Sequence, residues 1–259
     1  MTSPTRERLR RISSLSFSLA KVHFKLRNEG TYLGMFWYLL NPVVLFAVLL
    51  FVKHAAFSHI SIPNYPLYLL VGLVMQNYLS RSVLGAVDVI RKNGGFIRSV
   101  KIPLESLVVA SSLNLLYAHA FEAILVAGTI LFLGVPATTI VFYALSLLLF
   151  ALFALGVSFA ASTLGVFAND IGNIWPIFSQ ILFFITPIFY EVEPGTLLYA
   201  ANQFNPLYYF ISLARWPAYQ QPGASLPVLL AIAASLAAIG LAVGATVFRM
   251  HKRKFAELV

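Results

Sequence analysis

Long apolar stretches recur along this chain, and they constrain its fold more than any other feature of the sequence. A helix needs about 20 apolar residues to cross the hydrocarbon core of a bilayer. Backbone groups that face lipid can be satisfied only within a helix or a closed barrel, and the period-two alternation of barrel strands is absent. The sequence therefore predicts an all-α polytopic membrane protein with six spans. We place these spans near residues 31–52, 66–87, 107–134, 138–166, 171–190 and 226–248.

Composition supports this prediction. Hydrophobic residues make up 59% of the 259 positions and charged residues 10%, whereas soluble domains carry about 25% charged residues. There is no cysteine, so the chain has neither a disulfide framework nor a thiolate metal site. The first apolar run is too long for a secretory signal and has no small-residue cleavage site behind it, so we interpret it as a retained span.

The charge distribution predicts the orientation. Most of the 18 Lys and Arg residues lie in three short segments: before Glu29, between Arg91 and Lys101, and between Arg249 and Lys254. Positively charged loops stay in the cytoplasm, and six spans place all three segments on that side. We therefore expect a multi-pass protein of the cytoplasmic membrane with both termini in the cytoplasm. Its expected divisions are a tail with an interface helix (1–30), the transmembrane domain (31–248) and a basic tail (249–259).

Two cytoplasmic segments look organised. Residues 8–27 carry apolar side chains at steps of three and four, which indicates an amphipathic helix at the membrane interface. Phe17 and Phe24 lie opposite this stripe, so they either offer a second apolar surface to a partner protein or curl back to lipid. In the basic loop 88–106 we expect a short helix beginning around Phe96. The alternative is a solvated loop that only sets topology.

The outer segment 191–225 is too polar and too rich in proline to span the membrane, yet it contains many aromatic and aliphatic side chains. Such a stretch usually dips back or lies in the interface. We predict two short helices joined near Asn205 and Pro206.

Glu122 is the one costly residue inside the bilayer, near the middle of the third span. His119 lies one turn earlier on the same face, with Asn114 farther back. Ionisable groups at this depth usually mark a functional path. The alternative is a structural role, in which a protonated Glu122 is hydrogen-bonded to His119 or to a neighbouring helix. A metal site is not predicted, because two ligands are too few.

Aromatic clusters such as Trp37-Tyr38 and Phe183-Phe184 sit where the predicted spans meet water. They are explained by an aromatic belt, or they line a conduit and stack on the apolar faces of sugar rings. Phosphate-loop, zinc-protease and nucleophile-elbow motifs are all absent. We therefore expect no catalytic residue, metal or cofactor in this chain, and any ATP is used by another chain.

Four segments in order resemble the membrane subunit of bacterial ABC-2 type polysaccharide exporters, the group that moves O-antigen, capsule and teichoic-acid polymers. The first comprises Phe24–Arg27, Gly30–Gly34, Trp37 and Asn41-Pro42, similar to the family's Leu-Gly-x-x-Trp-x-x-x-x-Pro pattern. The second is Ile97–Pro103. The third, Val166–Ile171 with a following Gln180 to Tyr190 stretch, departs from the family, which usually shows Arg-Asp where this chain has Asn169-Asp170. The fourth runs from Phe204-Asn205-Pro206-Leu207 to Ala214-Arg215.

The resemblance implies a channel formed by two copies of the chain, two ATPase subunits that bind ATP and Mg beneath it, and a lipid-linked polysaccharide as substrate, with no nucleic acid involved. Segment 96–103 would be the coupling helix and 194–216 the outer gate. The implied coupling residues are Phe96, Ile97, Arg98, Lys101, Ile102 and Pro103, with Phe17 and Phe24 at the same interface and Asn169 and Asp170 in a cytoplasmic turn. The expected substrate pathway contains Trp37, Tyr38, His119, Glu122, Phe183, Phe184 and Tyr190. The expected gate contains Asn205, Pro206, Tyr208, Tyr209 and Arg215.

Three other functions are compatible with parts of the sequence. An ABC-2 exporter of a small lipid or drug would share the whole architecture. A proton-coupled carrier would use Glu122 and His119. A membrane enzyme is disfavoured, because no nucleophile and base pair is recognisable.

Overall fold

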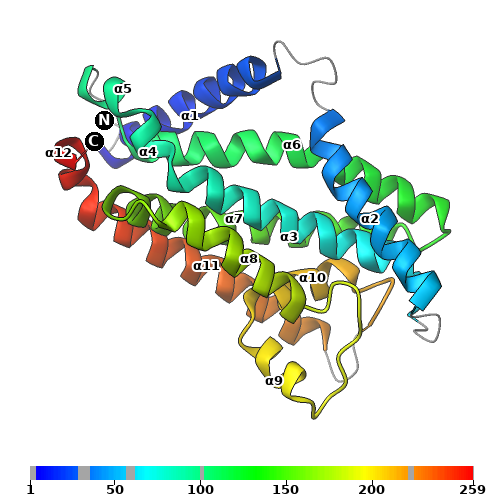
Figure 1. The fold of residues 1–259 in the computed structure, drawn as a ribbon. Coiled ribbons are helices and arrows are strands. Elements are labelled where there is room, and N and C mark those ends of the chain that lie inside the picture. The colour runs from blue at the N-terminus through cyan, green and yellow to red at the C-terminus, as the bar shows by residue number, and fades with distance from the viewer. Residues whose placement is uncertain (1–3, 29–35, 57–61, 100–101, 221–224, 259) are drawn as a thin grey trace.

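Every regular element in the described chain is a helix (Figure 1). The computed structural model describes residues 4–28, 36–56, 62–99, 102–220 and 225–258, without the side chains of 4–9, 23–28, 36–38, 256 and 257. The helices are α1 (Pro4–Asn28), α2 (Phe36–Ala56), α3 (Tyr65–Val87), α4 (Val89–Lys92), α5 (Gly94–Ser99), α6 (Glu105–Phe132), α7 (Thr138–Phe167), α8 (Ile171–Ile185), α9 (Leu197–Gln203), α10 (Pro206–Arg215), α11 (Leu226–His251), a 3₁₀ turn η1 (Lys252–Lys254) and α12 (Phe255–Leu258).

Four helices are long and apolar enough to cross a membrane: α2, α6, α7 and α11. α3 is long enough, but Gln76, Asn77 and Arg81 lower its mean hydropathy. α8 is apolar but only 15 residues long, and it ends at Ile185 rather than near Tyr190. The prediction of an all-α membrane protein is confirmed, whereas the count of six spans stays a prediction.

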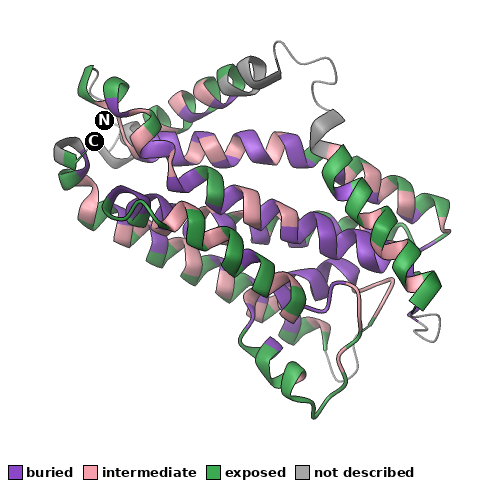
Figure 2. Cartoon of the chain, in the orientation of Figure 1, coloured by how far each residue is buried: buried purple, intermediate pink, exposed green. Residues whose placement is uncertain are grey.

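α3 lies at the centre of the bundle, which explains its polar residues. It packs against α6, α7, α8 and α10, and most of its side chains are buried (Figure 2). A helix surrounded by protein does not have to match the apolarity of lipid. α2 and α8, by contrast, expose much of their surface (Figure 2), and that surface is apolar, as expected for lipid or another subunit.

The most extensive helix pairing in the described chain joins α7 to α11. Gly156 of α7 and Gly244 of α11 bring the two backbones into direct contact: a Cβ atom added at Gly244 would collide with the carbonyl group of Gly156. One at Gly156 would collide with the carbonyl group of Gly240. Helices in membranes commonly associate through such contacts between small residues, because burying apolar surface away from lipid gives little free energy of association.

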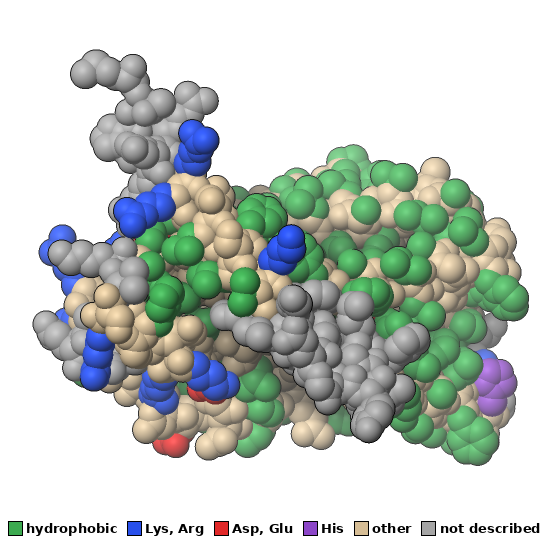
Figure 3. All heavy atoms as spheres, turned by 90° about the horizontal axis from the view of Figure 1, so that it is seen from above, with side chains coloured by type: hydrophobic (Ala, Val, Ile, Leu, Met, Phe, Trp, Pro, Cys, Tyr) green, Lys and Arg blue, Asp and Glu red, His purple; other side chains and the backbone are tan. Residues whose placement is uncertain are grey.

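Both termini lie at one end of the bundle, together with α4, α5 and α12 (Figure 1). We call this the terminal end. Lys and Arg side chains gather there, while the remainder of the visible face is largely hydrophobic (Figure 3). A separate hydrophobic cluster fills the terminal end, which we call the terminal core. Its buried members are Val89, Ile90, Leu107, Val108, Phe159, Val166, Phe248 and Phe255.

α1 lies along α6 at the terminal end. Ser16 and Ala20 are fully buried, and the Ser16 hydroxyl donates a hydrogen bond to the Ser106 carbonyl at 3.2 Å. Val22, which belongs to the apolar stripe predicted from the sequence, is exposed. The face of α1 that meets protein is therefore centred on small residues, because these let the two helices approach closely.

Candidate functional sites

The expected coupling segment forms two short helices, α4 and α5, at the terminal end. α5 begins at Gly94 rather than around Phe96, with the Ile97 amide donating to the Asn93 carbonyl at 2.9 Å. Phe96 and Arg98 are exposed, whereas Ile97 packs against the terminal core. α5 is thus anchored in the protein through Ile97, while Phe96 and Arg98 stay exposed.

The remaining residues expected at this interface divide into two groups. Ile102 packs against the terminal core and Pro103 is half-buried beside it, while Lys101 lies outside the described residues. Phe17 of α1 is 54% exposed, and the side chain of Phe24 lies outside the described residues. An apolar ring as exposed as Phe17 suits lipid or a partner protein.

Asn169 and Asp170 form the turn between α7 and α8, and both are exposed. The Asp170 carbonyl accepts hydrogen bonds from the amides of Asn173 and Ile174, both at 2.9 Å, and this starts α8. This turn therefore starts α8.

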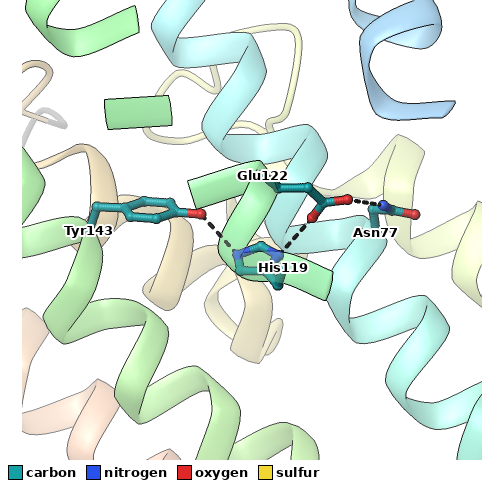
Figure 4. Close-up of polar contacts among 4 residues, drawn as sticks. All are labelled: Asn77, His119, Glu122 and Tyr143. Carbon is teal, nitrogen blue, oxygen red and sulfur yellow. Dashed lines mark hydrogen bonds and ion pairs between the residues drawn. The ribbon is translucent and has the colours of Figure 1, made fainter. Parts of the chain in front are cut away.

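A buried polar cluster joins α3, α6 and α7 (Figure 4). The two carboxylate oxygens of Glu122 have different partners: Asn77 Nδ2 donates to Oε1 at 2.9 Å, and His119 Nδ1 lies 2.7 Å from Oε2. His119 Nε2 lies 2.9 Å from the Tyr143 hydroxyl. His119 and Glu122 are 2% and 3% exposed, so this chain of contacts is shielded from solvent.

Each polar group in the cluster has a partner in either tautomer of the imidazole. If Nδ1 carries the proton, His119 donates to Glu122 and accepts from Tyr143. If Nε2 carries it, His119 donates to Tyr143 and accepts from a protonated Glu122. A buried carboxyl group is tolerated in an apolar setting when it is hydrogen-bonded in this way. The cluster can therefore bridge three helices, and its hydrogen bonds are satisfied in two states that differ by one bound proton.

Sequence reasoning found two of the four cluster residues and missed Asn77 and Tyr143. Neither could have been paired with Glu122 from the sequence, because each lies on a different helix. The polar step Gln76-Asn77 in an otherwise apolar helix was the available signal for Asn77. Asn114 does not join the cluster, and its buried Oδ1 has no hydrogen-bond partner among the described residues.

Arg215, the last residue of α10, joins α10 to α3 and to the chain after α8. Its guanidinium is 1% exposed and lies 3.5 Å from the centre of the Tyr68 ring. It donates hydrogen bonds to the carbonyls of Pro187 at 2.8 Å, Ile188 at 3.2 Å and Tyr68 at 2.5 Å. The Tyr68 hydroxyl donates in turn to the Pro187 carbonyl at 3.0 Å and the Tyr190 carbonyl at 2.8 Å. The carbonyls of Pro187, Ile188 and Tyr190 follow the end of α8 and have lost their helical partners, so Arg215 and Tyr68 satisfy them instead.

The two short outer helices predicted from the sequence are present as α9 and α10, joined at Asn205 and Pro206. Asn205 caps α10 by accepting from the Leu207 amide at 3.1 Å, and its Nδ2 donates to Thr186 Oγ1 at 2.8 Å. Pro206 occupies the first helical turn, where its missing N–H costs nothing. This pair of residues therefore both starts α10 and fastens it to the end of α8.

The three tyrosines expected at the gate and in the pathway, Tyr208, Tyr209 and Tyr190, lie in different environments. Tyr208 is buried, and Tyr209 is half-buried with its hydroxyl donating to the Gln203 carbonyl at 2.9 Å. Tyr190 closes the end of α8, where its hydroxyl donates to the carbonyls of Phe184 at 2.7 Å and Ile185 at 2.6 Å. These contacts give the hydroxyls of Tyr209 and Tyr190 local partners in the subunit.

Within one subunit, the residues expected to line the substrate pathway do not meet in a single site. His119 and Glu122 are buried, whereas Phe184 is 56% exposed and its ring lies 5.3 Å from that of half-buried Phe183. The side chains of Trp37 and Tyr38 lie outside the described residues. The choice between an aromatic belt and a conduit therefore depends on what covers α8.

The fold and these sites define an α-helical membrane protein whose polar groups are concentrated in its interior and at its terminal end. A family model described as ABC-2 type transporter matches residues 15–219. The chain belongs to this family of transport permeases, which confirms the resemblance seen in the sequence.

Individual relatives align over almost the whole chain. It is 26% identical to the O-antigen export system permease protein RfbA of Myxococcus xanthus over 256 residues, which cover 95% of each chain. It is 25% and 24% identical to two proteins of the same name from Klebsiella pneumoniae, each over 240 residues and 91% of both chains.

Proposed function

We propose that this chain is the membrane subunit of an ATP-driven exporter that moves a lipid-linked polysaccharide, such as O-antigen, across the bacterial cytoplasmic membrane. The observation that carries this proposal is the alignment of almost the whole chain, beyond residues 15–219 of the family match, with permeases named for O-antigen export. A shared fold alone would support transport without a substrate class.

The proposed topology has six spans, with α3 and α8 added to the four apolar helices. α3 rises about 34 Å over its length, enough to cross the hydrocarbon core. α8 rises only about 22 Å, and the chain that follows it to Tyr190 completes the crossing where Arg215 and Tyr68 satisfy its carbonyls. The clustering of Lys and Arg at the terminal end supports a cytoplasmic location for both termini (Figure 3).

The terminal end is the proposed docking site for two ATPase subunits, which bind the ATP and Mg that this chain does not. Phe96 and Arg98 of α5 and Phe17 of α1 present exposed side chains there. Aromatic residues and arginine are enriched at the centres of protein interfaces. Docking at α5 would transmit nucleotide-driven motion into the bundle through Ile97 and the terminal core.

The proposed channel forms between two copies of the chain. α8 packs chiefly against α3, so most of its surface is open in the monomer. Its exposed apolar side chains are Ile174, Ile177, Phe178, Ile181 and Phe184. With a second copy across this face, Phe184 would lie beside the conduit, where a flat apolar ring suits the apolar face of a sugar. The basic terminal end would attract the anionic diphosphate of a lipid carrier.

The test uses the gene in its host and the protein with its ATPase. A deletion strain should lose surface polymer and accumulate lipid-linked glycan inside the cell, and the purified chain should carry the ATPase with it. Normal surface polymer in the deletion strain would refute the proposal. Loss of resistance to a compound with an unchanged glycan pool would instead identify an exporter of small lipids or drugs.

A proton-coupled carrier is the second candidate, because Tyr143, His119 and Glu122 form a continuous buried chain whose hydrogen bonds are satisfied both with and without one additional proton (Figure 4). Such a carrier would need the ionisable carboxyl group, whereas an ATP-driven exporter would need only its hydrogen bonds. Export by the purified complex in the absence of a proton gradient would exclude the carrier.

A further inference from the structure

The last residues of the described chain fold back into the protein. η1 and α12, which together span Lys252–Leu258 and which we call the C-terminal hook, follow α11 directly. From the sequence, residues 249–259 were predicted only to be a basic tail. Phe255 is instead fully buried, as is Phe248 about two turns earlier in the chain. A fully buried aromatic ring indicates a fixed position rather than a free tail.

The hook connects three transmembrane helices at the terminal end. The Phe255 ring lies 5.3 Å from that of Phe248 on α11 and 6.3 Å from that of Phe167 on α7. Lys252 Nζ lies 2.6 Å from Glu105 Oε1 at the start of α6, and the Glu105 side chain is only 9% exposed. A short, partly buried charge-assisted contact of this kind fixes geometry better than an exposed ion pair does.

α5 depends on the hook for its position. A helix of six residues is not stable by itself, so its placement comes from the elements against which it packs. In the described chain α5 packs chiefly against α4, which precedes it, and against α12. Ile97 reaches the terminal core, of which Phe255 is a member. The hook is therefore the main support that α5 receives from outside its own loop.

We propose that the C-terminal hook is a positioning element for transport: it holds α5 against α6, α7 and α11, so that a push on α5 moves all three helices together. The proposal rests on the proposed docking of an ATPase at α5. Without the hook, α5 would move relative to the bundle, and ATP hydrolysis would continue without equivalent export.

Two variants test this in the full complex, each with a matched control. Phe255→Ala removes the buried ring, and Leu258→Ala shortens a side chain of the same hook that is 54% exposed. Lys252→Gln removes the charge that contacts Glu105, and Arg253→Gln removes an exposed charge at the next position. Phe255→Leu retains most of the apolar volume and should restore function if packing is what matters.

Export per ATP hydrolysed should fall about 5- to 150-fold in Phe255→Ala and Lys252→Gln, the usual range for loss of coupling between two sites. ATPase co-purification and hydrolysis should stay near wild type, and both control variants should export normally. Wild-type export per ATP in both test variants would overturn the proposal. Failure of the wild-type chain to bind the ATPase would instead refute the proposed function.

A second measurement does not depend on the ATPase. Because the chain has no cysteine, Ser99→Cys introduces a single labelling site on the exposed surface of α5. A spin label there should become more mobile in Phe255→Ala and in Lys252→Gln than in Leu258→Ala. Equal mobility in all three would show that the hook does not hold α5, whatever the transport result.

Discussion

Replacing Gly244 with alanine should destabilise the protein strongly, although the substitution adds only one methyl group. The new Cβ atom would collide with the backbone carbonyl of Gly156, and backbone atoms in the middle of two long helices cannot rotate out of the way. Overpacking typically costs about 1 to 3 kcal/mol. We expect the upper end of this range, because α7 and α11 form the most extensive helix pairing in the described chain and would have to separate along much of their length.

The expected size can be measured as a change in melting temperature. A loss of about 3 kcal/mol corresponds to a fall of about 6 to 12 °C for a chain of this size. Thermal unfolding of the detergent-purified protein, followed by tryptophan fluorescence, gives this value directly. Gly128→Ala is the matched control: Gly128 lies within α6, and a Cβ atom there would meet nothing within 4 Å.

The Gly128→Ala control shows the effect of replacing a helical glycine with alanine where there is no close contact. Alanine is favoured over glycine inside a helix by about 1 kcal/mol, so Gly128→Ala should leave the melting temperature unchanged or raise it. Similar melting temperatures for Gly244→Ala and Gly128→Ala would refute the close backbone contact between α7 and α11. A small effect of Gly244→Ala together with a large effect of Gly128→Ala would show that the closely packed glycine lies on α6 rather than on α11.

Substitutions at three further residues test the other sites. Glu122→Gln should retain export, because the glutamine amide can accept from Asn77 and donate to the His119 tautomer that carries its proton on Nε2. Glu122→Leu should destabilise the protein by about 1 to 3 kcal/mol, because it leaves Asn77 and His119 without this partner. Loss of export in a stable Glu122→Gln protein would contradict a purely structural role for Glu122. Arg215→Met should destabilise by about 1 to 3 kcal/mol, because it leaves buried carbonyls unpaired, and it should increase proteolysis between α8 and α10. Protease resistance equal to wild type would contradict the role of Arg215 in joining α10 to the chain after α8. Arg98→Glu should insert into the membrane normally but lower export while ATP hydrolysis is unchanged. Normal export by this variant would exclude a role for Arg98 in coupling.

Much of the fold could be predicted because the bilayer leaves few alternatives for an apolar chain. The starts of α3, α7 and α11 lie within a residue of the expected spans. The central position of α3 could not be predicted, since its polar residues are explained by neighbours that are remote in sequence. The end of α8 was misplaced for a related reason: the carbonyls after it are satisfied by Arg215 and Tyr68, so the chain can leave the helix before it has completed a span.

The sites could be predicted only where one segment contains them. Asn205 and Pro206 form a local signal for a helix start, and α10 begins there. The partners of Glu122 come from α3 and α7, and no spacing in the sequence connects them. The burial of Phe255 could not be predicted either, because the sequence around it is short and basic and the residues that cover the ring are remote in the chain.

The polar surface of α3 has a consequence for how the protein is made. On the proposed topology α3 is the second span to leave the ribosome. The helices that supply partners to Gln76, Asn77 and Ser82, which are α8, α6 and α7, are synthesised after it. Newly made α3 would then expose amides and hydroxyls to lipid. Its stable integration must wait for later helices to arrive, so the order of synthesis and the order of assembly differ in this protein.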